Sequence, residues 1–510
     1  MTDAPLKLFN SLTREIEIFT PVHPGEARVY TCGPTVYNYP HIGNMRAYVF
    51  ADVLGRTLSW KGYALTHVIN ITDVGHLTDD ADAGEDKLEK MAAERAQKGE
   101  KVAIWDIARH YTEAYWADVK ALNIREPAKW SIATDYIDEM LEFAKSIAAR
   151  HCYELDSGLY FDVSTVKDYG RLARAVTEEG EGRIDAVAGK RNAADFAIWR
   201  KTPPGETRQM EWDSPWGRGA PGWHLECSVM GGKLLGFPFD IHTGGIDHRE
   251  IHHPNEIAQN QAYCCTNGLD VAENSGARIW MHNNFLVERS GKMSKSSGEF
   301  LRLQLLIDKG YHPLAYRMMC LQAHYRSELE FSWEGLQAAL TRLKRMVMAV
   351  EALKSRHAEL VSASMPQLEP WARSEGWTLK QVQGDDRGKL APLIEKFDFA
   401  VSEDLNTAVA LTVLEDVIAA RKVDPARKLA LVAAMEAVLG TGVLELKRSD
   451  LRIRPKDAAL TTEHIEAAIA ARKELRAQQD YVALDRNRDE LTAKGVEVMD
   501  GDPLGWEWKL

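Results

Sequence analysis

The sequence predicts an α/β protein in which a parallel sheet, interrupted by an insertion, is followed by a helical bundle and a small mixed α/β C-terminal domain. Residues 29–31 and 64–72 have the apolar, β-branched character of strands, and residues 45–60 between them carry apolar side chains at helical spacing. A strand, a helix and a second strand in this order are typical of a parallel sheet. From Tyr311 onward, alanine- and leucine-rich helical segments replace the strand pattern until residues 495–508, which indicate a small hairpin.

The composition indicates a soluble, cytoplasmic protein of several domains. A chain of 510 residues is long enough for two to four domains and a large core. No apolar run approaches the roughly 20 residues that span a bilayer, and the N-terminus lacks the apolar core of a secretory signal. We therefore expect no membrane partner.

The cysteines and the charges leave two questions open. Six cysteines are scattered along the chain, which is no disulfide framework, so each is either a core residue or a metal ligand. The formal net charge of −12 argues against coating nucleic acid through bulk charge. Basic residues still crowd into residues 447–456 and 472–488, where they form either solvated helix faces or a local RNA contact.

The first strand leads into a short stretch with the features of an anion site. Cys32 and a Gly-Pro turn end the strand, and His41-Ile42-Gly43-Asn44 stands where the helix begins. A helix N-terminus offers unpaired N–H groups and a positive dipole end, and Gly43 lets a phosphate approach the backbone closely. The alternative is a tight turn with a structural histidine.

Other polar residues follow neighbouring strands of the predicted sheet. Ligands of parallel sheets bind beyond the carboxyl ends of the strands, which places Cys32 to Asn44 and Thr72-Asp73 on one rim. After a turn-rich, aromatic stretch from about 150 to 222, read as an insertion, a further strand ends in Gly244-Gly245 and Asp247. An acid beside a glycine pair can hold the hydroxyls of a ribose.

Cysteine, histidine and glutamate side chains suggest a metal site. Cys32, Cys227, His252 and Glu256 are of the types that zinc takes in a tetrahedron. His252 and Glu256 are four residues apart at a predicted helix start, although spacing alone equally allows His253. The adjacent Cys264-Cys265 pair is more typical of buried helix residues.

A loop near residue 290 carries two lysines between glycines, in the sequence Gly291-Lys-Met-Ser-Lys-Ser-Ser-Gly298. Small residues make such a loop mobile, and its lysines can be brought over a phosphate chain. HIGN followed by KMSKS resembles the motif pair of class I aminoacyl-tRNA synthetases. Asn44 stands where that family usually has a second histidine, and an amide can still donate a neutral hydrogen bond to a phosphate.

Further motifs narrow the resemblance. CGPTVY with HIGN, GWHLECS, DIH-x-GG-x-D running into HHPNEIAQ, KMSKS and AHYRSELEFS together resemble the cysteinyl-tRNA synthetases, over about residues 30 to 335. The resemblance implies that L-cysteine and ATP form cysteinyl-adenylate, from which cysteine passes to the 3′-terminal ribose of tRNA(Cys). It also implies one Zn2+ held by Cys32, Cys227, His252 and Glu256, and Mg2+ with ATP. Pro254 departs from the family pattern outside this ligand set.

The resemblance assigns expected roles to further residues. The phosphate-stabilising donors are His41, Asn44, Lys292 and Lys295; the ATP-binding residues are Gly43, Gly244, Asp247 and Lys295; and the residues bordering cysteine are Thr72, Trp223 and His242. Adenylyl transfer needs no general base, because the attacking carboxylate is already ionised, so positioning and charge stabilisation carry it.

The expected domains follow from the same reading, with a monomer as the expected state. They are residues 1–130 (Rossmann-type catalytic domain, first half), 131–222 (connective insertion), 223–310 (second half, with the KMSKS loop), 311–335 (stem-contact segment), 336–445 (helical bundle, with an inserted loop at 356–388) and 446–510 (anticodon-binding C-terminal domain). In the last domain, Trp506 and Trp508 either stack on bases or form the core of the hairpin.

Two other functions remain open from the sequence. A cysteine:amino-sugar ligase of mycothiol biosynthesis has the same front half. Residues 340–510, however, would have no role in an enzyme that acts on a small acceptor. A non-enzymatic, zinc-containing RNA-binding protein leaves the KMSKS loop unexplained.

Overall fold

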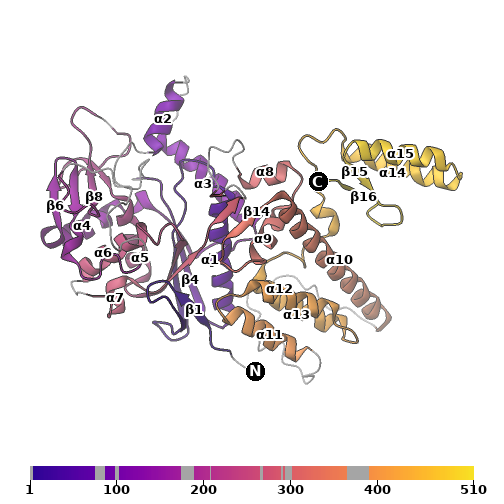
Figure 1. Ribbon diagram of the computed structural model, residues 1–510, viewed down its shortest axis with the longest axis horizontal. Helices are drawn as coiled ribbons and strands as arrows, with labels where there is room; N and C mark the ends of the chain where they lie inside the picture. Colours follow the sequence, from indigo (N-terminus) through magenta and orange to yellow (C-terminus); the bar gives the residue numbers. More distant parts are fainter. Residues whose placement is uncertain are drawn as a thin grey trace.

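The computed structural model describes residues 4–74, 87–97, 103–173, 189–206, 208–264, 268–288, 291–292, 301–364 and 390–510. Three parts follow one another along its long axis (Figure 1). The sheet and the insertion lie at one end, the helical bundle lies in the middle, and the C-terminal domain projects at the other end.

The central sheet has five strands, all paired in parallel. Its strands are β3 (Glu26–Thr31), β4 (Ala64–Ile71), β5 (Lys129–Ile132), β10 (Phe239–Gly245) and β11 (Ala277–Asn283), in the order β11-β10-β3-β4-β5. The predicted parallel sheet is thus confirmed. The chain order reverses between β10 and β3, and such a switch point opens a ligand crevice at the carboxyl ends of the two strands.

The helices of this part of the chain are α1 (Ile42–Trp60), α2 (Lys87–Gln97), α3 (Ile104–Ala121), α5 (Trp223–Leu235), α6 (His252–Cys264) and α7 (Ala272–Ser275). Of these, α1, α5 and α6 carry residues of the crevice. Residues 252–262 of α6 are all buried, because α6 packs against α5, α7 and the helix α4 (Ile137–His151). A helix buried on every side can keep polar side chains only where they bind one another or a ligand. The strands β1 (Lys7–Asn10) and β2 (Glu15–Ile18) form a hairpin, and β1 packs against β11.

A second, antiparallel sheet is inserted in the sequence between β5 and β10. Its strands are β6 (Cys152–Leu155), β7 (Gly158–Phe161), β8 (Phe196–Lys201) and β9 (Gly219–Pro221). The short helices η1 (Ala133–Tyr136) and η2 (Val163–Thr165) flank α4 (Ile137–His151), which packs beside this sheet.

A small three-stranded sheet leads from the central sheet into the helical bundle. It consists of β12 (Leu286–Glu288), β13 (Gly291–Lys292) and β14 (Leu329–Phe331). The helices that follow are α8 (Leu303–Asp308), α9 (Pro313–Leu321), α10 (Trp333–Ser364), α11 (Ala391–Ser402), α12 (Thr407–Ala419) and α13 (Pro425–Leu439).

Helix α10 corrects one prediction. The inserted loop was predicted to begin at Arg356, but α10 continues to Ser364. Residues 356–364 contain neither glycine nor proline and include good helix formers, and the first breaker is Pro366. The remainder of the expected loop, residues 365–388, lies outside the described residues.

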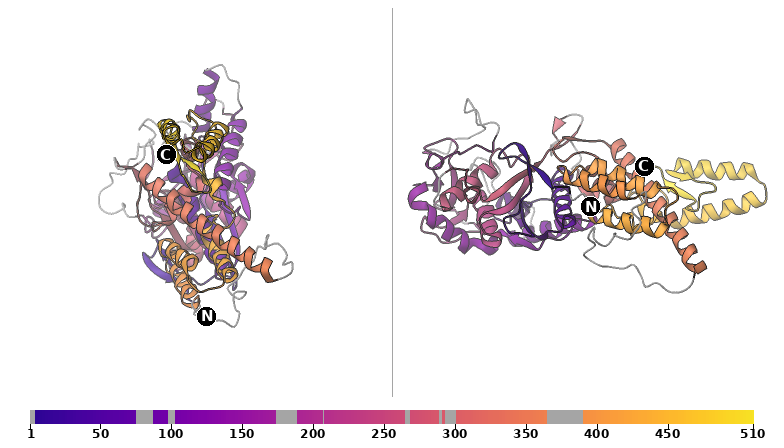
Figure 2. Two further views of the ribbon diagram at one scale, coloured as in Figure 1. Left: turned by 90° about the vertical axis from the view of Figure 1, so that its right-hand side faces the viewer. Right: turned by 90° about the horizontal axis from the view of Figure 1, so that it is seen from below.

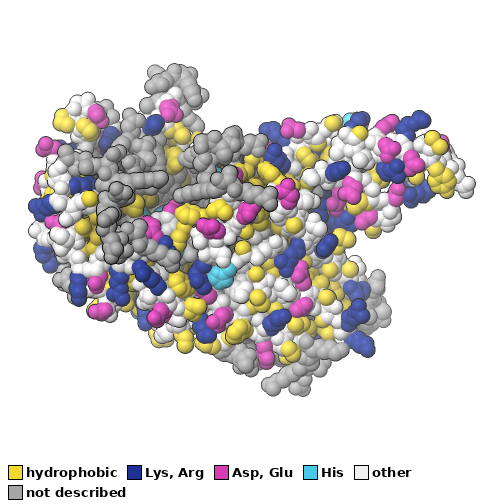
Figure 3. Space-filling model, in the orientation of Figure 1, with side chains coloured by type: hydrophobic (Ala, Val, Ile, Leu, Met, Phe, Trp, Pro, Cys, Tyr) yellow, Lys and Arg dark blue, Asp and Glu magenta, His cyan; other side chains and the backbone are white. Residues whose placement is uncertain are grey.

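The C-terminal domain has a hydrophobic core of its own. The domain consists of η4 (Arg448–Leu451), α14 (Thr462–Ala477), α15 (Tyr481–Ala493) and the hairpin of β15 (Val496–Val498) with β16 (Trp506–Trp508). The predicted hairpin is confirmed, and Trp506 and Trp508 are buried in its core. They are therefore packed against the domain's own side chains, and not exposed for stacking on bases. The domain extends away from the bundle (Figure 2), and its visible face mixes basic and acidic side chains (Figure 3).

Among the described residues, no helix combines the length and apolar character needed to cross a bilayer.

Candidate active site

A cavity of about 430 Å³ opens at the carboxyl ends of β3, β4 and β10. This volume is typical of sites for small molecules. Its lining includes Cys32, Gly33, His41, Gly43, Asn44, Asn70, Thr72, Trp223, Cys227, Gly245, Asp247, His248 and His252. Most of the residues singled out in the sequence thus meet in one crevice.

The start of α1 forms one wall of the cavity. The His41 ring caps the helix, since its Nδ1 accepts a hydrogen bond of 3.0 Å from the Gly43 N–H. In return the amide oxygen of Asn44 accepts a hydrogen bond of 3.1 Å from the His41 N–H. Asn44 therefore completes a capping box, and its exposed side chain lies at the helix end where anions bind.

Four predicted metal ligands converge at the floor of the cavity. The donor atoms of Cys32, Cys227, His252 and Glu256 all lie within 4.8 Å of one another, and all four residues are buried. Cys32 follows β3, Cys227 lies in α5, and His252 and Glu256 lie one turn apart on α6. The two Sγ atoms are 4.0 Å apart, and His252 Nε2 is 3.0 Å from Glu256 Oε1.

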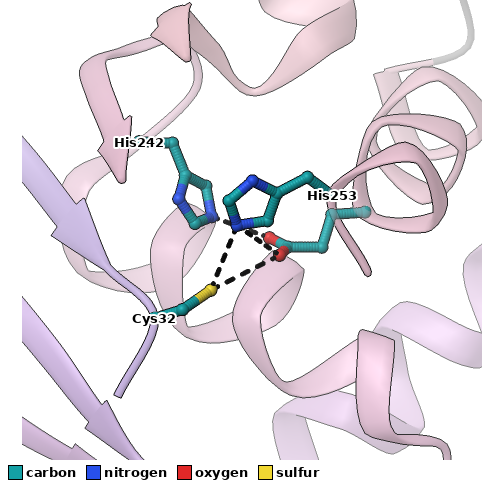
Figure 4. A group of neighbouring side chains, drawn as sticks. Cys32, His242 and His253 are labelled. Atoms are coloured by element: carbon teal, nitrogen blue, oxygen red, sulfur yellow. Dashed lines mark hydrogen bonds and ion pairs between the residues drawn. The ribbon is translucent and has the colours of Figure 1, made fainter. Parts of the chain in front are cut away.

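A second donor group overlaps the first. Cys32, His242, His253 and Glu256 also lie within 4.8 Å of one another, and Figure 4 shows the rings of His242 and His253 side by side above the Cys32 sulfur. His242 Nε2 is 2.9 Å from Glu256 Oε2, and His253 Nε2 is 3.3 Å from Cys32 Sγ. Each of the two donor groups thus contains one of the adjacent histidines, His252 or His253, which spacing in the sequence could not distinguish.

Hydrogen bonds behind His253 indicate how its ring is oriented. Its Nδ1 lies 2.8 Å from His282 Nε2, and His282 Nδ1 lies 2.8 Å from Ser11 Oγ. If the Ser11 hydroxyl donates to His282 Nδ1, then the Nε2–H of His282 donates to His253 Nδ1. His253 in turn presents its Nε2–H to the Cys32 sulfur. In that tautomer His253 supports a ligand through a hydrogen bond.

The electrostatics of the cluster favour charged donors. Burial raises the pKa of Glu256, but His242 and His252 outweigh it and lower the pKa to about 2. Hydrogen bonds from His252 to Cys227 and Glu256 likewise overcome burial and raise the pKa of His252 to about 10. The Cys32 thiol, through its hydrogen bond, lowers the pKa of Cys227 to about 6. These shifts favour the ionised forms of Cys227 and Glu256, and the proton on His252 would have to leave before its imidazole could bind a cation.

Other predicted residues occupy different positions. Trp223 lines the cavity and lies against His252, with ring centroids 4.4 Å apart. His242 lies behind the floor, stacked on Trp280 at 4.5 Å. At Gly244 a Cβ would lie 2.7 Å from His248 Nδ1, so glycine is needed there for the histidines to pack, while Gly245 and Asp247 reach the cavity.

Of the two lysines of the loop, the structure describes only Lys292. Lys292 lies in β13 and pairs with Val287 of β12. Lys295 lies outside the described residues.

Several polar residues of the site were missed in the sequence. Asn70 and Glu226 form buried hydrogen bonds with Thr72, and His224 lies 2.9 Å from His252, measured between their Nδ1 atoms. The available signal was a glutamate and a histidine within the otherwise apolar start of α5.

Comparisons with known proteins show the family of the chain. Residues 18–341 match the family model described as tRNA synthetases class I (C) catalytic domain. A cysteine–tRNA ligase of Novosphingobium aromaticivorans is 74% identical over 99% of this chain and 97% of its own length. Another from Zymomonas mobilis is 54% identical over 99% of this chain and 98% of its own length.

A solved structure shows the same fold at low identity. Methionyl-tRNA synthetase of Mycobacterium tuberculosis, bound by methionyl-adenylate, superposes with a TM-score of 0.51 at 14% identity. The match covers 84% of this chain and 93% of that one.

Proposed function

The chain belongs to the class I aminoacyl-tRNA synthetases, in the family of the cysteine–tRNA ligases, and on that premise we propose how its buried side chains select cysteine. The protein activates L-cysteine with ATP to cysteinyl-adenylate and transfers the cysteinyl group to the 3′-terminal ribose of tRNA(Cys). Its relatives match along 99% of the chain, C-terminal domain included, and this is the part for which an amino-sugar ligase has no use.

The metal we propose is Zn2+, held by Cys32, Cys227, His252 and Glu256. The observation that carries the proposal is the convergence of two sulfurs, an imidazole and a carboxylate on the cavity floor. This set has two sulfurs where the overlapping set has one, and zinc favours thiolates. His242 and His253 then act behind it, because each can donate a hydrogen bond to one of the ligands, Glu256 and Cys32.

Such a site would explain selection of cysteine without editing. Bound zinc supplies a soft Lewis acid that takes the substrate sulfur as a thiolate, which a serine hydroxyl or an alanine methyl cannot match. A cavity alone would separate these side chains only ten- to a few hundredfold. Cys32, Cys227 and Trp223 line the cavity at the place where the side chain of cysteine would enter.

The phosphates of ATP would bind along the start of α1. The His41 ring and the amide nitrogen of Asn44 offer donors there, beside the positive end of the helix dipole, and Gly43 keeps the backbone accessible. Lys292 and Lys295 would add positive charge, and Mg2+ would accompany ATP. The end of β10, with Gly244 below and Asp247 at the surface, would hold the ribose.

The amino and carboxyl groups of cysteine would lie between Thr72 and Trp223. Both line the cavity, whereas His242 would act through its hydrogen bond to Glu256. One chain holds every group named here, and we propose that the enzyme acts as a monomer, in the cytoplasm.

The C-terminal domain would read the anticodon. Since Trp506 and Trp508 are buried, the stacking partner we propose is Tyr481, whose side chain is 62% exposed at the start of α15.

The zinc proposal is tested by Cys227→Ser, with Cys152→Ser in the inserted sheet as the matched control. A neutral hydroxyl is a poor substitute for a thiolate at a soft site, so the variant should lose zinc. Its affinity for cysteine should fall by about a hundredfold or more, as for a lost metal–ligand bond, and its affinity for ATP should change little. The measurements are metal content and separate affinities for both substrates.

Two results would contradict this assignment. One is a Cys227→Ser protein that keeps stoichiometric zinc. The other is a protein that loses zinc, melts at a much lower temperature and binds neither substrate, which indicates a structural metal.

A further inference from the structure

A chain of buried hydrogen bonds runs from the loop after β3 to α5. The Gly33 N–H donates to Asn70 Oδ1 at 2.7 Å, and Asn70 Nδ2 donates to Thr72 Oγ1 at 3.0 Å. The Thr72 hydroxyl then donates to Glu226 Oε2 at 3.0 Å. Asn70, Thr72 and Glu226 are at most 2% exposed, so water cannot substitute for a lost partner.

The direction of this chain is fixed at its first member. A backbone N–H can only donate, so Asn70 must turn its oxygen to Gly33 and its NH₂ group to Thr72. A threonine hydroxyl has one proton, and because its oxygen already accepts from Asn70, that proton is directed at Glu226 Oε2. Burial raises the pKa of Glu226, and a neutral carboxyl that carries its proton on Oε1 still accepts at Oε2. The oxygen of Thr72 has one lone pair left, and Thr72 lines the cavity.

The backbone holds Thr72 at a fixed place beside Cys32. The Thr72 N–H donates to the Pro34 carbonyl at 3.0 Å, and the Val36 N–H donates to the Thr72 carbonyl at 3.1 Å. At Gly33 a Cβ would lie 1.5 Å from the Asn70 carbonyl oxygen, so only glycine permits this approach. The sulfur side of the cavity and the Thr72 hydroxyl are therefore parts of one rigid rim.

We propose that Asn70 and Glu226 are positioning residues that make Thr72 a pure hydrogen-bond acceptor for the protonated α-amino group of cysteine. An ammonium group has only donors, so a hydroxyl that turned its proton toward the cavity would repel it. This inference rests on the proposed function and adds to it a second point of recognition, independent of the sulfur. Glu226 belongs to neither donor group of the metal cluster, and its Oε1 has no hydrogen-bond partner among the described residues.

Two partial analogues of cysteine separate the two recognition points. Cysteamine keeps the thiol and the ammonium group, and 3-mercaptopropionate keeps the thiol and the carboxylate. Each is measured as an inhibitor of cysteine-dependent ATP–pyrophosphate exchange by the full-length zinc enzyme. The variants are Thr72→Val and Glu226→Leu, with Glu226→Gln as the conservative change that still accepts from Thr72.

The expected result is selective. Inhibition by cysteamine should weaken about ten- to a hundredfold in Thr72→Val and Glu226→Leu, as for a lost charge-assisted hydrogen bond. Inhibition by 3-mercaptopropionate, the KM for ATP and zinc content should be unchanged, and Glu226→Gln should stay within a few-fold of wild type. Thr134→Val is the matched control, because it removes a 2.6 Å hydroxyl–carboxylate bond to Asp73 from a residue that does not line the cavity.

Three outcomes would overturn the inference. They are equal loss of inhibition by both analogues, unaltered inhibition by cysteamine in the variants, and a selective loss of inhibition by cysteamine in Thr134→Val as well. Failure of the zinc proposal would show already in the wild-type enzyme. There, both thiols would inhibit no better than ethanolamine and 3-hydroxypropionate, their alcohol counterparts.

Discussion

The metal cluster was predicted from residue types and a family resemblance, and the RNA contact of the C-terminal domain from crowded basic residues. The fold brings the first set together and pairs most of the second with acids. Cys32, Cys227, His252 and Glu256 are spread over more than two hundred positions of sequence and meet within 4.8 Å in the interior. The basic residues of 447–488 are close in sequence, and the fold separates most of them into ion pairs.

The pairs account for most of the C-terminal charge. Arg448 lies 2.6 Å from Asp502 and 3.0 Å from Glu507, and Asp500 lies 2.7 Å from Arg472 and 3.1 Å from Arg476. Arginine at a surface readily finds an acid, so sequence crowding says little about free charge. Buried thiols, imidazoles and carboxylates without partners are costly, so their convergence says much about a ligand.

Removing residues 446–510 tests the whole comparison and should have the largest effect. Charging of tRNA(Cys) should fall by at least about a thousandfold, because the contacts to the anticodon region are lost together. Cysteine-dependent pyrophosphate exchange should stay within a few-fold of wild type, since the cavity contains no residue of the domain. The two rates are measured side by side.

The truncated protein should remain folded, because the domain has a separate core. A melting curve is therefore the control. Normal charging by a folded, truncated enzyme would move anticodon reading to another part of the chain.

Lys295→Ala tests the catalytic side of the comparison. A charge-assisted contact made mainly in the transition state should cost about 3 kcal/mol, or roughly a hundredfold in exchange rate, with little change in cysteine binding. Lys295→Arg keeps the charge on a different shape and should lose less. An unchanged exchange rate in Lys295→Ala would remove this residue from the mechanism.

His67→Gln tests whether the interior beneath the cavity is as dry as the cluster requires. His67 lies in β4, with Nε2 2.8 Å from Thr31 Oγ1, and burial lowers its pKa to about 4. Above pH 6.5 both the folded and unfolded states hold a neutral ring. Between pH 6.5 and about 4 only the unfolded state takes up the proton, so stability is lost as the pH falls.

The loss attributable to His67 should reach about 3 kcal/mol at pH 4, and His67→Gln should abolish it. Urea unfolding at several pH values measures the difference. His464, exposed on α14, provides the control, since His464→Gln should leave the acid dependence as it is. Equal acid dependence in wild type and His67→Gln would mean that water reaches the ring.

The sequence predicted the parts of the site that depend on local pattern. Hydrophobic periodicity indicated the sheet and α1. Residue chemistry suggested Cys32, Cys227, His252 and Glu256 as metal ligands, and the family resemblance singled out this set. Spacing alone could not choose between His252 and His253, because adjacent positions at the start of α6 both reach Glu256. The roles proposed for the site residues remain predictions.

Tertiary contacts account for what was missed. Thr72 and Glu226 are 154 positions apart, and neither side chain indicates the hydrogen bond between them. The extension of α10 was missed because the helical residues 356–364 were read together with the serine-, proline- and tryptophan-containing stretch that follows.

The smallest effect should come from Arg448→Gln, and it decides whether the C-terminal arginines are structural. Arg448 Nη1 and Nη2 bind Asp502 and Glu507, and Glu507 also receives Lys344 of α10, so the pairs fasten the hairpin to the bundle. Their loss should destabilise the domain by about 1 kcal/mol, seen as faster hydrogen exchange in α14 and α15.

If Arg448 is structural, the salt dependence of tRNA charging should match that of wild type. An arginine that instead neutralised a phosphate would, when removed, lower the slope of log affinity against log salt by about one unit and leave hydrogen exchange unaltered. Arg488→Gln provides the comparison, because Arg488 is exposed and pairs only with Asp485 and Asp489 of its own helix among the described residues. A salt slope that falls in Arg448→Gln would show that pairing within the domain does not prevent an arginine from binding RNA, and the contrast with the metal cluster would then be one of degree.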